Sequence, residues 1–211
     1  MMNSINTSEN HSNSSSENEL LRRYVAGDKD AFEEILTRYK DQLYAFLRRF
    51  LNNQQLVEDA FQDTFLQLYQ SRKTFEKDKP LRPWLFTIAA NKARDALRKQ
   101  QRHDTVSIAA MAEPTELSID DVMNSLKAYE ITPYDEAEKT EHAEKVRRII
   151  SEMPENLREI LMLAYFEQFS YKQMADVLSI PIGTVKSRLH TAIVFFTKKW
   201  KSATGDGDGK F

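Results

Sequence analysis

The sequence predicts an all-α protein with two small helical domains joined by an acidic linker, the second of which contains a helix-turn-helix. Apolar residues recur at three- and four-residue steps through most of residues 19–102 and 141–201, which is the period of a helix. The 211 residues include only 5 Gly and 6 Pro, too few for a turn-rich β fold. An acidic stretch in which the helical period is weak separates the two helical parts.

The first helical domain is expected over residues 19–102. Residues 1–18 precede it and are rich in Asn and Ser, so they lack the apolar side chains that folding requires and are expected to form a disordered tail. Polar breaks at residues 52–53 and 75–83 interrupt the helical pattern. The helices expected between these breaks cover residues 31–51, 56–71 and, beginning at Arg82 or Pro83, 82–102.

The linker is expected over residues 103–140, with one short helix near residues 119–129. Nine acidic residues and one lysine occupy residues 104–138, so this segment is strongly negative. The second domain is expected over residues 141–201, and a flexible tail over residues 202–211. The helical pattern of the second domain is broken at Pro154, at residues 169–170 and at residues 179–183.

The segment IPIGTVKSRLHTA, residues 180–192, predicts a tight corner between two helices. A short helix over residues 171–178 must end before Pro181, because proline lacks the donor that a continuing helix needs. Gly183 is expected to allow the turn, and Thr184 to cap the next helix. Such a short helix, turn and polar-faced helix are typical of a helix-turn-helix, whose second helix enters the major groove of DNA.

This second helix is expected to present two different faces. Its apolar face packs inward, and its polar face would meet DNA, where lysine and arginine bind guanine edges or phosphates. A helical corner in a scaffold is the alternative, which six basic residues against one acid over residues 170–201 disfavour. The residues expected inward are Val185, Leu189, Ala192 and Phe196; those expected to meet DNA are Thr184, Lys186, Ser187, Arg188, His190 and Thr191, with Val194 on the same face.

A second basic segment coincides with the helix over residues 82–102. Six basic residues and one acid lie between residues 81 and 102, and aromatic and basic groups share one helical face. Cations that follow phosphates beside aromatic rings are typical of a surface for single-stranded nucleic acid. For Trp84 itself, burial in the core is the alternative. The inward face holds Leu85, Phe86, Ala89, Ala90, Ala93, Ala96 and Leu97; the outward face holds Trp84, Thr87, Ile88, Asn91, Lys92, Arg94, Asp95, Arg98 and Lys99, and Arg82 stands at the start of the helix.

The segment VEDAFQDTFLQLY, which begins at Val57, predicts an amphipathic helix with an acidic outer face. Such a face with one exposed leucine suits a protein partner that offers basic helices, and it equally suits plain solvent. The residues expected inward are Val57, Phe61, Thr64, Phe65 and Leu68; those expected outward are Glu58, Asp59, Gln62, Asp63 and Leu66.

Several classes of function are disfavoured. Cysteine is absent, which excludes disulfides, thiolate metal sites and cysteine nucleophiles. Four histidines are scattered without metal-ligand spacing, and no phosphate loop or nucleophile constellation occurs, so no enzyme, cofactor or metal site is expected. No apolar run approaches the roughly 20 residues that cross a bilayer, and no secretory signal is evident. A cytoplasmic protein without membrane insertion is therefore expected.

Several segments, in this order, resemble one family: DAFEEILTRY at residues 30–39, VEDAFQDTF at 57–65, RPWLFTIAANKARDALRKQQR at 82–102, and LREILMLAYFEQFSYKQMADVLSIPIGTVKSRLH at 157–190. They look like sigma factors of bacterial RNA polymerase, specifically the extracytoplasmic-function (ECF) branch that has only two folded domains. A stand-alone helix-turn-helix repressor would explain the last segment alone, and a helical adaptor would leave both basic segments without a purpose.

The resemblance implies binding to core RNA polymerase and recognition and melting of promoter DNA. The outward residues of the segment beginning at Val57 would dock on the polymerase's largest subunit. The outward face of residues 82–102, with Phe75, Lys77 and Lys79 of the preceding loop, would contact the melted −10 element. The outward face of the helix-turn-helix would read the −35 element. The branch is often held by an anti-sigma factor, which is a further partner that the resemblance implies.

Three positions depart from the family's pattern. After Arg-Leu-His the family usually continues with further arginines, whereas Thr191 and Ile193 stand here. A weaker or altered −35 contact is expected, with exposed apolar residues over 193–196 that serve a partner. Ser179 stands where the turn commonly has glycine, so the fine geometry of the turn is expected to differ.

Overall fold

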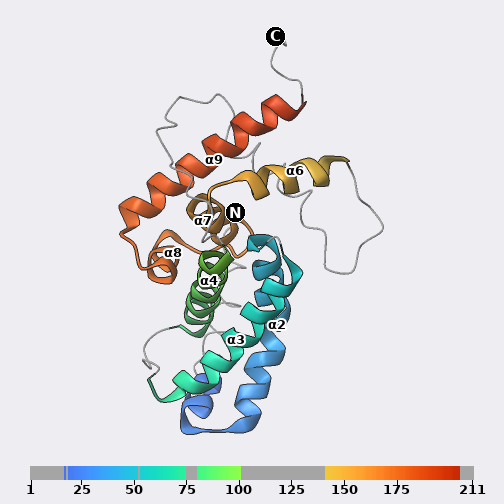
Figure 1. The fold of residues 1–211 in the computed structure, drawn as a ribbon. Coiled ribbons are helices and arrows are strands. Elements are labelled where there is room, and N and C mark those ends of the chain that lie inside the picture. The colour runs from blue at the N-terminus through green and yellow to red at the C-terminus, as the bar shows by residue number, and fades with distance from the viewer. Residues whose placement is uncertain (1–16, 18, 52, 75–79, 101–140, 205–211) are drawn as a thin grey trace, which may run out of the picture. The chain divides into compact units, whose positions relative to one another are not determined.

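The computed structural model describes residues 17, 19–51, 53–74, 80–100 and 141–204. Throughout these ranges the regular secondary structure is helical, so the predicted all-α class is confirmed (Figure 1). The chain divides into two compact units, Met1–Gln100 and Gln101–Phe211, each with its own apolar core. The linker predicted over residues 103–140, with its short helix, lies outside the described residues.

The first unit begins with a helical stretch at residues 19–26, which three longer helices follow. Side chains fix where two of these begin. The Asp28 carboxylate accepts hydrogen bonds from two amides in the first turn of one helix, and the Asn53 side chain accepts one from the Leu56 amide in the next. Asn53 therefore starts its helix at Gln54 rather than near Leu56. The elements are α2 (Lys29–Phe50), α3 (Gln54–Gln70), the 3-10 turn η1 (Ser71–Thr74) and α4 (Leu81–Gln100).

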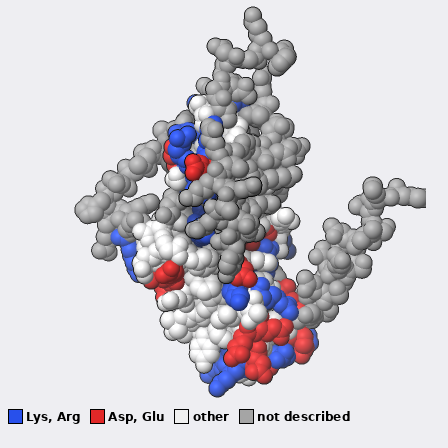
Figure 2. Space-filling view, turned by 90° about the vertical axis from the view of Figure 1, so that its right-hand side faces the viewer, with Lys and Arg blue, Asp and Glu red and all other residues white. Residues whose placement is uncertain are grey.

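The cap of α2 is reinforced by Arg23. Its Nε donates to Asp28 Oδ2 at 2.8 Å, and this bond, followed by the amides of the first turn, holds the pKa of the Asp28 carboxyl below its usual range. Because the folded-state pKa is lowered, this interaction stabilises the fold at neutral pH and is lost as the pH falls through the folded-state pKa. On the outer surface of α2, Arg38 and Glu34 form a further ion pair at 2.9 Å, and Figure 2 shows acidic and basic side chains intermixed over the first unit.

The core of the first unit lies where α2, α3 and α4 pack against one another. Phe46 of α2 meets Phe86 of α4 edge to face, with 5.3 Å between the ring centroids. Both rings are almost completely buried. The buried α2 residues recur at the three- and four-residue steps that the sequence shows; they are Ala31, Ile35, Tyr39, Leu43, Phe46, Leu47 and Phe50.

The turn before α2 is tied to the end of α3. Gly27 has a φ of 98°, a backbone conformation that favours glycine. A Cβ at Gly27 would lie 3.1 Å from Nη1 of Arg72. Tyr24 donates a hydrogen bond to the Leu68 carbonyl, and burial raises the pKa of Tyr24 to about 12. The phenol therefore keeps its proton and remains a donor at neutral pH.

The second unit consists of α6 (Glu141–Glu152), α7 (Glu155–Tyr165), α8 (Tyr171–Leu178) and α9 (Ile182–Thr204). The long helix α9 packs against the other three, and Figure 1 shows it running past α6, α7 and α8. The break predicted at Pro154 is present, because this residue occupies the N-cap of α7. The C-terminal tail was expected from residue 202, but the structure continues α9 to Thr204.

An ion pair ties α6 to the C-terminal half of α9. Lys199 Nζ lies 2.7 Å from Glu152 Oε2. Lys199 holds the pKa of the Glu152 carboxyl below its usual range, mainly through this hydrogen bond. Because both side chains are exposed, this ion pair adds little to the stability of the fold. Its contribution is chiefly to the orientation of α6 and α9.

Among the described residues, no helix combines the length and the apolar character needed to cross a membrane.

Candidate nucleic-acid interface

The corner between α8 and α9 is built by a residue in the left-handed conformation. Ser179 has φ 54° and ψ 45°, and its N–H donates to carbonyls of the last turn of α8. The Ile180 N–H donates to the Ala175 carbonyl at 3.1 Å. This pattern of two bonds back into the helix ends α8 and reverses the chain within a few residues. At the other end of α8, Ser170 and Gln173 form a reciprocal capping box.

The predicted roles of Gly183 and Thr184 in this corner were wrong. Helix α9 begins at Ile182, so both residues lie inside its first turn. The Val185 N–H donates to the Pro181 carbonyl at 3.0 Å, which places Pro181 just before the helix. The physical reason is that Ser179 already turns the chain, so Gly183 need not supply a left-handed residue. Proline is tolerated before a helix because the donor that it lacks has no partner there.

Replacing Ser179 by glycine is expected to stabilise the second unit. A left-handed non-glycine residue costs about 1 kcal/mol relative to glycine, so Ser179→Gly should raise the unfolding free energy by about that amount. Chemical denaturation followed by circular dichroism measures it. Ser151→Gly, inside α6, is the matched control and should destabilise by several tenths of a kcal/mol to about 1 kcal/mol. A loss of stability in Ser179→Gly would contradict the left-handed corner.

The N-terminal half of α9 presents a polar surface. Lys186, Ser187 and His190 are exposed, while Thr184, Arg188 and Thr191 are half-buried. Two hydroxyls donate back to the helix: Ser187 to the Thr184 carbonyl at 3.1 Å, and Thr191 to the Ser187 carbonyl at 2.9 Å. Their oxygens thus face outward chiefly as acceptors. The predicted inward residues are buried: Val185, Leu189, Ala192 and Phe196.

The apolar residues after His190 do not form an exposed patch. Ile193 and Val194 are each 8% exposed and Phe196 is 1% exposed. Placing Val194 on the polar face was therefore wrong, and so was the expectation of exposed apolar side chains at Ile193 and Phe196 for a partner; Phe195, between them, is half-buried. Their burial follows from the packing of α6, α7 and α8 on α9, which covers a wider arc of this helix than a single neighbour would.

Two large apolar side chains beside the polar surface were missed by the sequence-based prediction. Tyr171 at the start of α8 is 47% exposed and Ile182 at the start of α9 is 44% exposed. Lys186 Nζ lies 5.7 Å from the Tyr171 ring centroid, within the range of a cation–π contact. The sequence could have indicated that Tyr171 is exposed, because Tyr171 directly follows the N-cap residue Ser170 and so lies in the first turn of α8. Side chains in the first turn lie at the end of a helix, where fewer neighbouring elements cover them.

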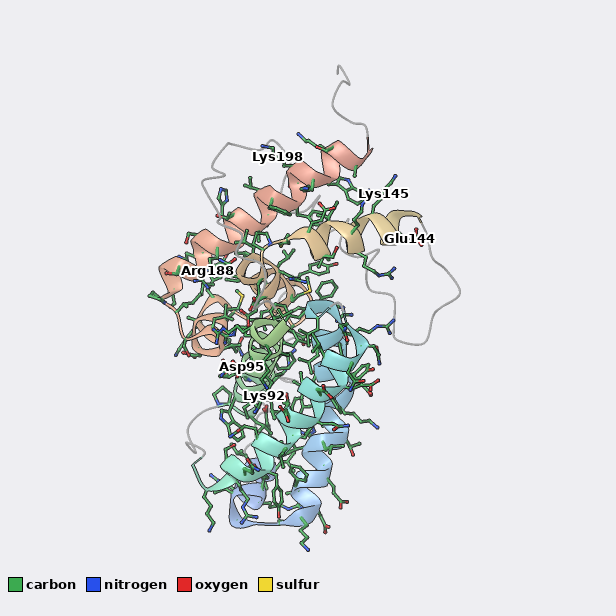
Figure 3. The ribbon with its side chains drawn as sticks, viewed as in Figure 1. Lys92, Asp95, Glu144, Lys145, Arg188 and Lys198 are labelled. Carbon is green, nitrogen blue, oxygen red and sulfur yellow. The ribbon has the colours of Figure 1, made fainter. Side chains whose placement is uncertain are left out.

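Helix α4 carries the second group of predicted DNA contacts. Asn91 and Arg98 are exposed, and Arg82, Trp84, Lys92 and Arg94 are half-buried. Figure 3 shows Lys92 and Asp95 on this helix. Ile88 is only 8% exposed, so placing it on the outward face was wrong; it packs inward because α4 contacts both α2 and α3. Phe75, Lys77 and Lys79 lie outside the described residues.

The basic side chains of α4 are held by their neighbours. Arg94 donates to Asn91 Oδ1 at 2.6 Å and to the Ala90 carbonyl at 3.3 Å. Arg98 Nη1 lies 3.3 Å from Asp95 Oδ1. These contacts keep the guanidinium groups along the helix surface.

The outer face of α3 is acidic at its start and apolar at its end. The five residues predicted outward are all exposed, and Leu66 is 54% exposed. Tyr69, one turn further on, is 56% exposed and was missed. Its ring packs edge to face on Phe32 of α2 at 5.5 Å between centroids. The five residues are Glu58, Asp59, Gln62, Asp63 and Leu66.

Within the described part of the chain, no cluster of three or more acidic or histidine side chains is arranged to hold a metal ion. His190 is exposed on α9. The side chains of His11, His103 and His142 lie outside the described residues.

Two family models match the chain. Sigma-70 region 2 matches residues 35–103, which include α3 and α4. Sigma-70 region 4 matches residues 143–194, which include α7, α8 and the N-terminal half of α9. The two matches therefore cover both helical units and each of the surfaces described above.

Curated relatives match over most of their length. The chain is 31% identical over 173 residues to the ECF RNA polymerase sigma-E factor of Haemophilus influenzae, covering 82% of this chain and 89% of that protein. It is 29% identical over 170 residues to the ECF RNA polymerase sigma factor SigW of Bacillus subtilis, covering 81% of this chain and 89% of that protein.

Two solved structures share the fold. One is CnrH in complex with the cytosolic domain of CnrY, with a TM-score of 0.61 and 22% identity, covering 92% of this chain and 99% of that chain. The other is the sigma factor RpoE in complex with the anti-sigma factor NepR from Bartonella quintana, with a TM-score of 0.58 and 23% identity, covering 81% of this chain and 96% of that chain. At these identities the likeness concerns the fold alone.

Proposed function

The chain belongs to the ECF branch of the sigma factors of bacterial RNA polymerase, and on that premise we propose which of its surfaces perform each step. It binds core RNA polymerase and directs promoter-specific initiation of transcription. The observation that carries the assignment is the match of both sigma regions, in order, to two separate helical units. We assign residues 19–102 to polymerase and −10 binding, residues 103–140 to the spacer, and residues 141–201 to −35 binding.

We propose that the exposed half of α9 reads the −35 element. Lys186 and His190 are exposed on one side of this polar face, and the half-buried Arg188 lies at its opposite edge. In a helix-turn-helix the N-terminal residues of the second helix enter the major groove. Lysine and arginine donate there to guanine or to phosphate, and the outward oxygens of Ser187 and Thr191 accept from base amino groups.

We propose that α4 holds the melted −10 element. The guanidinium groups of Arg94 and Arg98 lie on the outer surface of α4 and would neutralise phosphates, and the half-buried Trp84 lies on the same helix. Flipping a base out of the duplex costs a few kcal/mol. Phosphate neutralisation along α4 offsets part of this cost. Phe75, Lys77 and Lys79 are assigned to the same element from the family resemblance.

The outer face of α3 is proposed as the polymerase-docking surface. Four polar or acidic side chains and one leucine are exposed together there. Exposed acids attract a basic helical partner and speed its association, and a central apolar residue gives it a desolvated contact. The face consists of Glu58, Asp59, Gln62, Asp63 and Leu66.

Neither DNA-binding surface has to bind tightly alone. Once the polymerase holds the chain, each surface meets its DNA element at a high effective concentration. The chain is proposed to act as an initiation factor and not as an enzyme, in the cytoplasm, where the polymerase works on DNA. One solved neighbour is a sigma factor in complex with an anti-sigma factor, and this supports an anti-sigma factor as a further proposed partner.

Run-off transcription on fragmented genomic DNA tests the proposed function. Purified chain and bacterial core RNA polymerase should form a complex, and the transcripts should start downstream of two shared, spaced sequence elements. Start sites without shared elements, or a folded chain that forms no complex, would contradict the proposal. Promoter binding by the chain without polymerase would instead support a stand-alone repressor.

A further inference from the structure

Helix α4 is capped by a carboxylate from the far end of its unit. Glu17 Oε1 accepts a hydrogen bond from the Arg82 backbone N–H at 3.2 Å and another from the Tyr39 hydroxyl at 3.1 Å. Glu17 thus lies at the N-terminus of a helix that begins 64 residues later along the chain. A carboxylate in this position satisfies an unpaired amide and interacts favourably with the positive end of the helix.

The local sequence explains why α4 takes its cap from so far away. The residue before the helix is Pro80, whose side chain has no acceptor, and Pro83 in the first turn has no N–H. The Trp84 N–H reaches the Pro80 carbonyl at 3.5 Å, which is a long bond. In the first turn the Leu81 and Arg82 amides consequently have no acceptor within the helix, and Glu17 supplies the acceptor for the Arg82 amide.

Separate contacts hold the side chain of Arg82. Its Nε donates to Gln42 Oε1 at 3.4 Å, and its guanidinium carbon lies 5.2 Å from the Phe86 ring centroid. Tyr39, which is 5% exposed, anchors the other side of the Glu17 carboxylate. Burial, followed by the neighbouring Glu17, raises the pKa of Tyr39, so the hydroxyl remains a donor at any working pH. The start of α4 is therefore held by contacts with Gln42 of α2, with Phe86 in the second turn of α4 itself, and with Glu17.

We propose that Glu17 is a positioning residue for DNA melting: by capping α4 it holds Arg82 and Trp84 in the geometry that receives the single-stranded −10 element. The proposal rests on the function proposed above for α4. It assigns a role to a residue that lies outside both matched sigma regions. Glu17 itself touches no DNA, and its effect is transmitted through the Arg82 amide.

The test measures binding of a fluorescent single-stranded oligonucleotide to the holoenzyme. The oligonucleotide carries the non-template strand of a −10 element that run-off transcription has identified. Glu17→Leu removes the acceptor while keeping a side chain of similar size, and it should weaken oligonucleotide binding about tenfold, the order expected for losing a charge-assisted hydrogen bond. Glu17→Gln retains Oε1 as an acceptor and should stay within about threefold of wild type.

Glu19→Leu is the matched control, because Glu19 is exposed and pairs only loosely with Arg22 at 3.7 Å. It should bind the oligonucleotide like wild type. Affinity for core polymerase is measured on every variant and should change little. The thermal midpoint of the free chain is measured alongside it and should fall by a few degrees in Glu17→Leu, because the helix cap is lost. Wild-type oligonucleotide binding in Glu17→Leu would overturn the proposal. So would an equal loss in Glu17→Gln, or a parallel loss of polymerase affinity, since either would point to another role for Glu17. A wild-type holoenzyme that does not bind the oligonucleotide would instead overturn the function proposed for α4.

Discussion

The double variant Lys186→Ala, Arg188→Ala is expected to lower initiation from −35-dependent promoters by roughly 100-fold. Each side chain sits in the N-terminal half of α9, from which a helix-turn-helix contacts bases and phosphates. A good contact to a base edge is worth about 1–3 kcal/mol, and two lost contacts of about 1.4 kcal/mol each multiply to that factor. Transcription from one promoter with intact and scrambled −35 elements measures the effect.

A matched control for this experiment lies on the same helix. Lys198 is exposed like Lys186, but it lies about 18 Å further along α9 at 1.5 Å per residue, and Figure 3 shows it far from Arg188. Lys198→Ala should transcribe like wild type. The double variant should also bind core polymerase normally, and a loss of that binding would contradict the separation of DNA reading from docking.

Reversing two charges on α3 is expected to weaken assembly with the polymerase. In Asp59→Lys, Asp63→Lys, two exposed acids that would face a basic partner become repulsive, and like charges across an interface cost several kcal/mol. We expect affinity for core polymerase to fall about 10- to 100-fold, chiefly through slower association, with a weaker dependence on salt. Fluorescence anisotropy of labelled chain titrated with core enzyme measures affinity and rate.

The control for the charge reversal is another pair of exposed acids in the same unit. Glu33→Lys, Asp41→Lys changes the net charge equally on α2, away from the proposed face. Assembly should then be nearly unchanged. If both pairs weakened assembly alike, net charge alone would be responsible and the docking face on α3 would be wrong.

The helices and their buried faces were predictable because the apolar period is strong. The inward residues of α2, and those of α9 from Val185 to Ala192, follow a single face at 100° per residue. That argument fails where a helix is covered on more than one side. Val194 and Ile88 lie outside the predicted inward faces and are buried because several helices pack on α9 and on α4. The number of neighbours around a helix is a property of the tertiary fold that periodicity does not contain.

The sequence predicted a corner before α9, but the residue that turns the chain there differs from the predicted one. Glycine is the usual left-handed residue, so Gly183 was the natural choice from the sequence. The structure uses Ser179, and the intrinsic preference of serine does not reveal this, because the bonds from Ser179 and Ile180 back into α8 decide it. The exposed Tyr69 was missed for a related reason, since its apolar character suggests burial, while its packing on Phe32 leaves one ring face outside.

The cap that Glu17 provides has a practical consequence for protein engineering. Composition makes the polar start of the chain look dispensable, and a natural choice for expression would delete residues 1–18. That deletion would remove the acceptor for the Arg82 amide and the Tyr39 hydroxyl. The shortened protein would retain the core of its first unit and its acidic α3 face, so it would still purify and assemble. Its weak promoter opening would then be misread as a property of the natural factor, whereas a cut after residue 16 keeps the cap.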